Sequence, residues 1–279
     1  MRILVTGAGG LLGSAVVSEG GGRGHDMHAF HRRTLDVTDE VAVSAAVAEC
    51  APDTVIHCAA YTNVDLAESE RDIAMAVNRD GTRNVARAAA SAGALMVYIS
   101  TDFVFDGRSE RPYAPDDPPN PINHYGRSKL AGEAAVKQAG GAWTIVRCGW
   151  FYGEGGTDFV DVILERARAG GPLRVVDDQV GAPSWTGSVA PALLDLVEKS
   201  ATGVLHLCDR GEVTRVDWAR AALTLAGVDL EVEPVSSEAF AVPAERPAYS
   251  VLNGEAAEAI LGRAMPEWSE SLRTYLQAV

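Results

Sequence analysis

Tyr125 and Lys129 are the two residues whose types and spacing point most directly to chemistry. They lie four residues apart in HYGRSK (124–129), at the expected start of a helix, so their side chains share one face. A free tyrosine has a pKa of about 10, and a neighbouring cation stabilises its phenolate. Lysine is rare in this chain, with three against 21 arginines. The pair predicts a tyrosine general acid, Tyr125, whose pKa Lys129 lowers.

Hydroxyl and carboxyl groups follow a predicted strand at 95–101. The stretch ISTDFVFDG places Thr101 and Asp102 at its carboxyl end, where open α/β sheets bind ligands. A threonine hydroxyl there can hydrogen-bond a carbonyl oxygen beside Tyr125. We therefore expect Thr101 to act with Tyr125 and Lys129, whereas Asp102 could also be a simple turn residue.

A glycine-rich turn, TGAGGLLG, follows the first strand-like stretch (2–7) and opens the first predicted helix. Gly7, Gly10 and Gly13 have the spacing GxxGxxG. Such glycines permit a tight turn and allow the backbone to approach a pyrophosphate at the positive helix N-terminus. In this position the pattern predicts dinucleotide binding.

The end of the second strand indicates which dinucleotide to expect. An acid there binds the ribose 2′-hydroxyl of NAD, and an arginine favours the 2′-phosphate of NADP. The stretch AFHRR ends in Arg32 and Arg33 without an acid, so we expect NADPH. Asp36 remains an alternative ribose ligand that would suit NADH, or it only leads into the helix that Thr38 or Asp39 caps.

The elements that must position these residues alternate between short β-type runs and Ala-rich helical stretches. Several strands are continuously apolar, as in a parallel sheet covered on both faces. We predict an α/β fold with a doubly wound parallel Rossmann sheet in residues 1–149. Residues 150–279 are expected to form a smaller substrate-binding lobe, with segments that return to the sheet. The predicted strands are 2–7, 27–31, 54–60, 95–101, 143–148, 173–178 and 203–209, and the predicted helices are 10–20, 39–50, 71–93, 127–140, 215–226 and the tail.

Composition excludes several classes of partner. With 38 acidic and 24 basic residues, the net charge of −14 disfavours binding to nucleic acid or anionic membranes. No run reaches the roughly 18 to 20 apolar residues of a membrane span, and no signal-peptide pattern follows Met1, so we expect a cytoplasmic protein. The four cysteines are far apart and indicate buried free thiols, and no histidine or cysteine spacing indicates a metal site.

Several motifs together resemble one family. They are GxxGxxG, AAYTNVD (59–65), STDFVFDG (100–107), YGRSK (125–129), RCGWFYG (147–153), DQVGAPS (178–184) and RPAYSVLN (246–253). With them the chain is similar to the extended short-chain dehydrogenase/reductases and, within these, to the dTDP-4-dehydrorhamnose reductase family, from Arg2 to the tail.

The resemblance implies an oxidoreductase site along the carboxyl ends of the strands. It implies a nucleotide-sugar substrate that faces Thr101, Asp102 and Trp150, while Trp150 could also be plain core. A homodimer is compatible with it. It implies NAD(P)H held by Gly10, Leu11, Leu12, Asp36, Val37, Ala59, Ala60, Tyr61, Tyr125 and Lys129.

Arg246, in ERPAYSVLN, is the candidate for the substrate diphosphate, because a guanidinium grips phosphate through two parallel hydrogen bonds. The alternative is an ordinary structural arginine. The chain departs from the family at Phe103, where a tyrosine is usual, and at His57, where a small polar residue is usual. Asn78 matches a family asparagine near the catalytic lysine.

The function expected from these features is NAD(P)H-dependent reduction of the C4 ketone of a dTDP-4-keto-6-deoxy sugar. dTDP-4-dehydro-L-rhamnose is the first candidate substrate. One rival is a nucleotide-sugar epimerase or dehydratase that retains NAD, although Phe103 stands where dehydratases carry a second acid. Another is a non-catalytic binding subunit like the β subunit of methionine adenosyltransferase, against which the intact Tyr125 and Lys129 argue.

Overall fold

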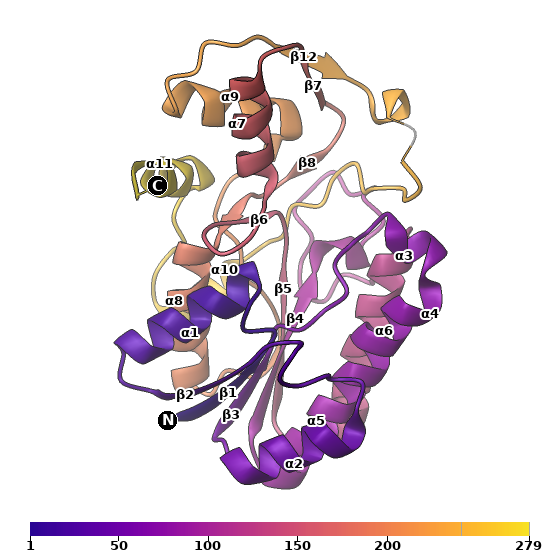
Figure 1. Cartoon of the computed structure of the whole chain (residues 1–279), viewed down its shortest axis with the longest axis vertical. Helices are drawn as coiled ribbons and strands as arrows, with labels where there is room; N and C mark the ends of the chain where they lie inside the picture. The colour runs from indigo at the N-terminus through magenta and orange to yellow at the C-terminus, as the bar shows by residue number, and fades with distance from the viewer. Residues whose placement is uncertain (241, 279) are drawn as a thin grey trace.

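The computed structural model describes residues 1–240 and 242–278, and its centre is a six-stranded parallel sheet (Figure 1). Across the sheet the strands follow the order β10 (Gly203–His206), β5 (Trp143–Cys148), β4 (Leu95–Thr101), β3 (Thr54–His57), β1 (Arg2–Thr6) and β2 (Asp26–Phe30). The predicted doubly wound α/β fold is confirmed. Chain order reverses between β1 and β3, which is where such sheets bind ligands at their carboxyl ends.

Helices cover both faces of the sheet, so the strand residues are buried on either side. Ile3 packs in one core with Val16, and its neighbour Leu4 packs in the other with Val47; all four are at most 2% exposed. This two-sided burial explains the unbroken apolar runs. One face carries α1 (Leu11–Gly22) and α8 (Thr186–Glu198), and the other carries α2 (Glu40–Cys50), α5 (Thr82–Ala92) and α6 (His124–Ala139) (Figure 1).

The helix expected at 71–93 is divided by a π-helical turn. It consists of α4 (Arg71–Met75), the π-helix η1 (Ala76–Gly81) and α5, and the short α3 (Leu66–Ser69) precedes it. Asn78 lies in the π turn and is fully buried. Wide turns of this kind concentrate at functional sites because they displace one side chain from the regular helical register.

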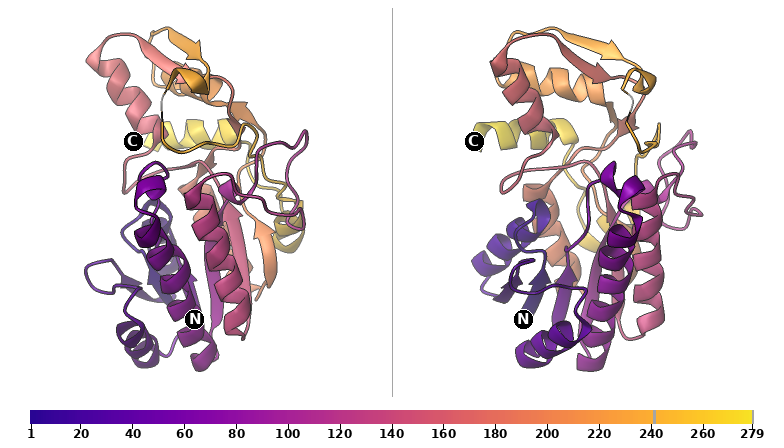
Figure 2. Two further views of the ribbon diagram at one scale, coloured as in Figure 1. Left: turned by 90° about the vertical axis from the view of Figure 1, so that its right-hand side faces the viewer. Right: turned by 45° about the vertical axis from the view of Figure 1, so that its right-hand side comes forward.

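After β5 the chain builds a smaller layer across the carboxyl ends of the strands, as the two views of Figure 2 show. Its interior is aromatic: Trp218 stacks on Phe159 with ring centroids 4.5 Å apart and meets Tyr152 edge-on at 5.6 Å. β10 then pairs in parallel with β5. The remaining elements are η2 (Asp102–Val104), β6 (Phe151–Tyr152), α7 (Phe159–Ala169), β7 (Leu173–Val176), β8 (Val180–Gly181), β9 (Ser184–Trp185), β11 (Val213–Thr214), α9 (Arg215–Leu225), β12 (Val232–Val235), η3 (Ser237–Ala239), α10 (Glu255–Leu261) and α11 (Trp268–Ala278).

The helix α8 is not among the predicted elements. Its start follows the turn-like stretch VGAPSW, and Pro191 lies inside it, which normally argues against a helix. Its buried side chains, including Val189 and Leu193, nevertheless join the core under α1. Tertiary burial therefore outweighs the local preference against helix.

The structure places the four cysteines as free thiols. Cys50, Cys148 and Cys208 are buried, but Cys58 is partly exposed, which corrects the expectation that all four are buried. In residues 1–240 and 242–278 no helix is both long and apolar enough to cross a bilayer.

Candidate active site

Two cavities adjoin at the carboxyl ends of β1, β3 and β4. The larger cavity has a volume of about 1030 Å³, and the smaller cavity has a volume of about 540 Å³. They meet because several residues line both of them: Gly7, Gly9, Gly10, Cys58, Ala60 and Thr62. A long ligand laid over the glycine loop would therefore reach both cavities.

The glycine loop is shaped by close backbone contacts. Gly7 has a φ of 70°, and a Cβ there would collide with the backbone at Ala59, which follows β3. A Cβ on Gly13 would likewise collide with the carbonyl oxygen of Gly7. Gly10 caps α1 without a side-chain hydrogen bond, so the first N–H groups of α1 remain available. This cradle fits a dinucleotide pyrophosphate.

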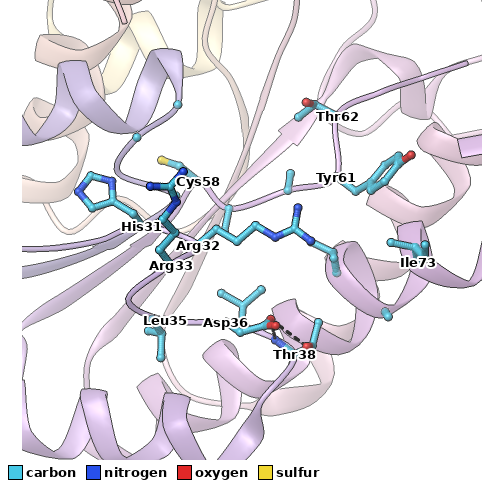
Figure 3. Close-up of a pocket in the computed structure, with 18 of the residues that line it drawn as sticks. His31, Arg32, Arg33, Leu35, Asp36, Thr38, Cys58, Tyr61, Thr62 and Ile73 are labelled. Carbon is cyan, nitrogen blue, oxygen red and sulfur yellow. Dashed lines mark hydrogen bonds between the residues drawn. The ribbon is translucent and has the colours of Figure 1, made fainter. Parts of the chain in front are cut away.

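The larger cavity brings the predicted cofactor residues Arg32, Arg33 and Asp36 together (Figure 3). Asp36 does not present a free carboxylate: its Oδ1 accepts hydrogen bonds from the Thr38 backbone N–H (2.9 Å) and hydroxyl (2.8 Å). These bonds hold the pKa of Asp36 below its usual value. Val37, Ala59, Ala60 and Tyr61 complete the predicted residues in this wall.

The smaller cavity brings together the residues expected to react. Tyr125, Lys129, Thr101, Asp102 and Trp150 all line it. So do Gly7, Gly10, Leu11, Leu12 and Gly13 of the loop.

Tyr125 is placed by the first turn of α6. The side chain of Asn123 caps this helix by accepting from the N–H of Gly126 (2.8 Å). Gly126 lies so close to the carbonyl oxygen of Phe103 that a Cβ would collide with it. The ring of Phe103 meets Tyr125 edge-on, with centroids 5.9 Å apart. The helix start is thereby fixed against the end of β4.

Burial dominates the protonation of the tyrosine–lysine pair. It raises the pKa of Tyr125 well above the ordinary value, although a hydrogen bond with Thr101 acts in the opposite direction. It lowers the pKa of Lys129 to about 7, against the charge of Glu133. The Lys129 Nζ donates to the carbonyl oxygen of Ile99 (2.6 Å). Desolvation is the largest effect on the Tyr125 pKa in this structure, and the stabilisation of its phenolate by Lys129 stays a prediction.

Asp102 is a buried acid beside the tyrosine. Its Oδ1 accepts from the Thr101 hydroxyl (2.9 Å), whereas its Oδ2 has no partner among the described residues. Burial raises the pKa of Asp102 to about 6, while the nearby hydroxyls of Ser250 and Thr101 act in the opposite direction. A buried oxygen without a partner at a cavity wall is suited to a ligand hydroxyl.

A buried ion pair ties β4, β5 and α6 together below the smaller cavity. Arg147 donates from Nε and Nη2 to the two carboxylate oxygens of Glu133 at 2.8 Å each. Ser100 also donates to Glu133 (2.6 Å), and all three are at most 4% exposed. Because Ser100 precedes Thr101 and Glu133 lies one turn after Lys129, this pair fixes Thr101 relative to the helix.

Asn78 and His57 have structural partners. Asn78 accepts from the Tyr61 N–H (2.8 Å) and donates to the Ser128 hydroxyl (2.8 Å), so it joins the loop after β3 to α6 beside Lys129. His57 bonds to the hydroxyls of Thr6 (2.6 Å) and Thr82 (3.1 Å). Burial lowers the pKa of His57 to about 3, so this ring is neutral.

Arg246 is not where the sequence argument places it. It lines neither cavity, and its guanidinium makes a two-pronged pair with Asp65 at 2.9 and 2.7 Å. It also donates to the carbonyl oxygen of Ala244 (2.8 Å). The guanidinium of Arg246 is thus already paired, and it joins the loop before α3 to the C-terminal segment. Its predicted contact with the substrate diphosphate is not supported.

The cavities contain polar residues that the sequence argument missed, among them His31, Arg215 and Cys58. His31 lines the larger cavity, Arg215 lines the smaller one, and Cys58 lines both. Burial raises the pKa of Cys58 to about 12, so its thiol is protonated. His31 directly precedes the two predicted arginines, which is a usable signal, whereas nothing near Arg215 in the sequence indicates a ligand.

Comparisons with known proteins agree with this arrangement. The family model described as RmlD substrate binding domain matches residues 1–279. A dTDP-4-dehydrorhamnose reductase of Mycolicibacterium smegmatis is 42% identical, over 100% of this chain and 86% of that protein. A dTDP-4-keto-6-deoxy-D-glucose reductase of Streptomyces niveus is 40% identical, over 91% and 89%. A solved dTDP-4-dehydrorhamnose reductase of Bacillus anthracis in complex with NADP superposes with a TM-score of 0.96 at 37% identity, covering 100% and 99% of the two chains.

Proposed function

The chain belongs to the dTDP-4-dehydrorhamnose reductase family, and on that premise we propose that it reduces the C4 ketone of a dTDP-4-keto-6-deoxy sugar, with dTDP-4-dehydro-L-rhamnose as the first candidate. The observation that carries the proposal is the joining of the two cavities. Tyr125, Lys129 and Thr101 line the smaller cavity, and the glycine loop that borders it continues into the larger cavity. Related reductases act on sugars of this class.

The proposed mechanism assigns proton transfer to the protein. A reduced nicotinamide would supply the hydride to C4. Tyr125 is protonated at neutral pH, and because the alkoxide that forms at C4 is a stronger base than the phenolate, the tyrosine can donate its proton to the ketone oxygen. The Thr101 hydroxyl, which lines the same cavity, orients that oxygen. Lys129, beneath the same cavity, supplies positive charge while the phenolate is present.

We further propose that NADPH is the preferred cofactor. Arg32 and Arg33 line the larger cavity, and neither has an ion pair within residues 1–240 and 242–278. Asp36 would have to accept the 2′-hydroxyl for NADH, but the Thr38 backbone and hydroxyl already occupy one of its oxygens. Arg32 and Arg33 thus offer positive charge for the 2′-phosphate of NADPH. Asp36, which would bind the 2′-hydroxyl of NADH, is already partly hydrogen-bonded.

The direct test is oxidation of NADPH by the purified chain with dTDP-4-dehydro-L-rhamnose, beside its C5 epimer and the UDP counterpart. We expect one NADPH consumed per sugar reduced, and faster turnover with NADPH than with NADH. Purified protein that carries stoichiometric NAD and interconverts sugars without net oxidation would instead show an epimerase. Absence of NADPH oxidation with every sugar would contradict the proposal.

A further inference from the structure

Arg215 is a cation of the second layer that lines the smaller cavity. It is the first residue of α9, and its backbone N–H donates to the carbonyl oxygen of Gln179 (3.2 Å). Its guanidinium lies 3.5 Å from the ring centroid of Trp150 and 5.0 Å from that of Phe159. Arg215 and Trp150 both line the smaller cavity, and both come from the part of the chain after β5 that is expected to bind the substrate.

Arg215 has no direct ion-pair partner among the described residues, and Asp102 is the acid whose charge acts on it. Among the described residues its side chain makes no hydrogen bond and no ion pair. It lies at a helix N-terminus, where the helix dipole disfavours a cation. Burial, together with the charge of Arg246, lowers the pKa of Arg215 to about 9, so it stays protonated at neutral pH. An arginine in this position destabilises the fold unless an anion offsets it.

The backbone at Trp150 positions its indole against the Arg215 guanidinium. Trp150 has a φ of 51°, a left-handed backbone conformation that bulky residues rarely adopt. The strained backbone turns its indole under the guanidinium and stacks it on Trp218 at 5.6 Å. A guanidinium flat on an indole keeps its N–H edge free for hydrogen bonds.

We propose that Arg215 binds the diphosphate of the nucleotide-sugar substrate. This inference rests on the proposed function, and it assigns to Arg215 the contact that the sequence analysis assigned to Arg246. Asp102 lines the same cavity, its charge acts on Arg215, and its Oδ2 is left for the sugar. The cofactor also carries phosphates, but the free N–H groups at the start of α1, on the opposite wall, are the place for them.

The test compares three variants of the full chain. Arg215→Leu removes the charge, Arg215→Lys keeps it without the fork, and Arg220→Leu is the control. Arg220 lies on the same helix but is exposed and pairs with Asp217 (3.1 Å). Calorimetric titration with dTDP, thymidine and NADPH measures each binding event separately, and steady-state kinetics give KM and kcat for the keto sugar.

We expect Arg215→Leu to weaken dTDP binding and raise the sugar KM by about tenfold to a hundredfold, as for the loss of a charged hydrogen bond. Thymidine and NADPH affinities should stay within about twofold, Arg215→Lys should be intermediate, and Arg220→Leu should match the wild type. Unchanged dTDP affinity and KM in Arg215→Leu would overturn the inference. Weaker NADPH binding with unchanged dTDP binding would overturn it too, in favour of a cofactor phosphate.

The failures of the two proposals are distinguishable. If the wild type reduces the keto sugar and Arg215→Leu keeps its KM, only the role of Arg215 is wrong. If the wild type oxidises no NADPH with any keto sugar, the proposed function itself is wrong, and dTDP binding then decides the role of Arg215 alone.

Discussion

Tyr125 carries the proposed proton transfer, so its hydroxyl is the first group to remove. Tyr125→Phe keeps the ring that packs edge-on against Phe103. We expect kcat to fall by about 10²- to 10⁴-fold, the usual contribution of a positioned acid, with NADPH affinity unchanged. Stopped-flow measurement of NADPH oxidation and fluorescence titration of the cofactor check the two parts. A kcat within about threefold of the wild type would remove Tyr125 as the acid.

Cofactor choice is also a residue-scale property. Replacing both Arg32 and Arg33 by alanine should raise the Kd for NADPH by about tenfold or more, because a charged contact to the 2′-phosphate is lost. The Kd for NADH should change little, and calorimetry measures both. Asp36→Asn is the comparison: if the acid bound the ribose, NADH affinity would fall sharply, whereas the bond to Thr38 predicts a small effect.

Arg246 and Arg215 show where residue-level prediction ends. Motif spacing identified Tyr125 and Lys129, because side chains four apart on a helix share a face whatever the rest of the chain does. The role of Arg246 depends on Asp65, 181 positions away, and no local pattern reveals that pair. The position of Arg215 likewise depends on how α9 packs against Trp150 and Phe159, which are distant in sequence.

At the scale of elements, the fit between α6 and the end of β4 is the critical contact. Gly126→Ala places a methyl group against the carbonyl oxygen of Phe103, so we expect lower kcat and a lower midpoint of thermal unfolding. The control is Gly21→Ala in α1, where a Cβ meets nothing within 4 Å. That change should stabilise the protein by about 0.5–1 kcal/mol and leave kcat unchanged. Calorimetry and the NADPH assay measure both variants, and equal effects would contradict the account.

Element prediction succeeded where burial and periodicity agree. β4 and β5 have the predicted bounds, since both are apolar runs buried on two sides. The predicted helix at 71–93 was right in extent but concealed the π turn, which depends on Asn78 reaching Tyr61 and Ser128. α8 was missed because Pro191 argues against helix locally while packing under α1 favours it.

For the whole molecule, the parallel sheet brings the ends of β1, β3, β4 and β5 to one edge, and this much follows from the alternating pattern of the sequence. The other wall of the cavities does not follow from that pattern. It comes from the layer between β5 and β10, whose short strands and aromatic core carry little periodicity. Residues contributed by that layer were accordingly predicted least well.

The free energy of unfolding should depend on pH because Lys129 is buried. Burial lowers its pKa from the ordinary 10.5 to about 7, so between these two pH values the unfolded chain binds more protons than the folded one. The lysine therefore contributes a gain in stability as pH rises from 7 to 10. Lys129→Met lacks this contribution. The unfolding midpoint of the wild type should therefore rise relative to that of the variant between pH 7 and pH 10. A difference independent of pH, measured by calorimetry, would show that Lys129 is not desolvated.

The central claim is that hydride passes to C4 of the sugar in the smaller cavity. The most direct measurement is NMR of the product formed from NADPH deuterated at the transferable position of C4 of its nicotinamide. We predict one deuterium at C4 of the sugar for each NADP⁺ formed, and none within the same time for Tyr125→Phe. Product without deuterium at that carbon, or deuterium at another sugar carbon, would contradict the account.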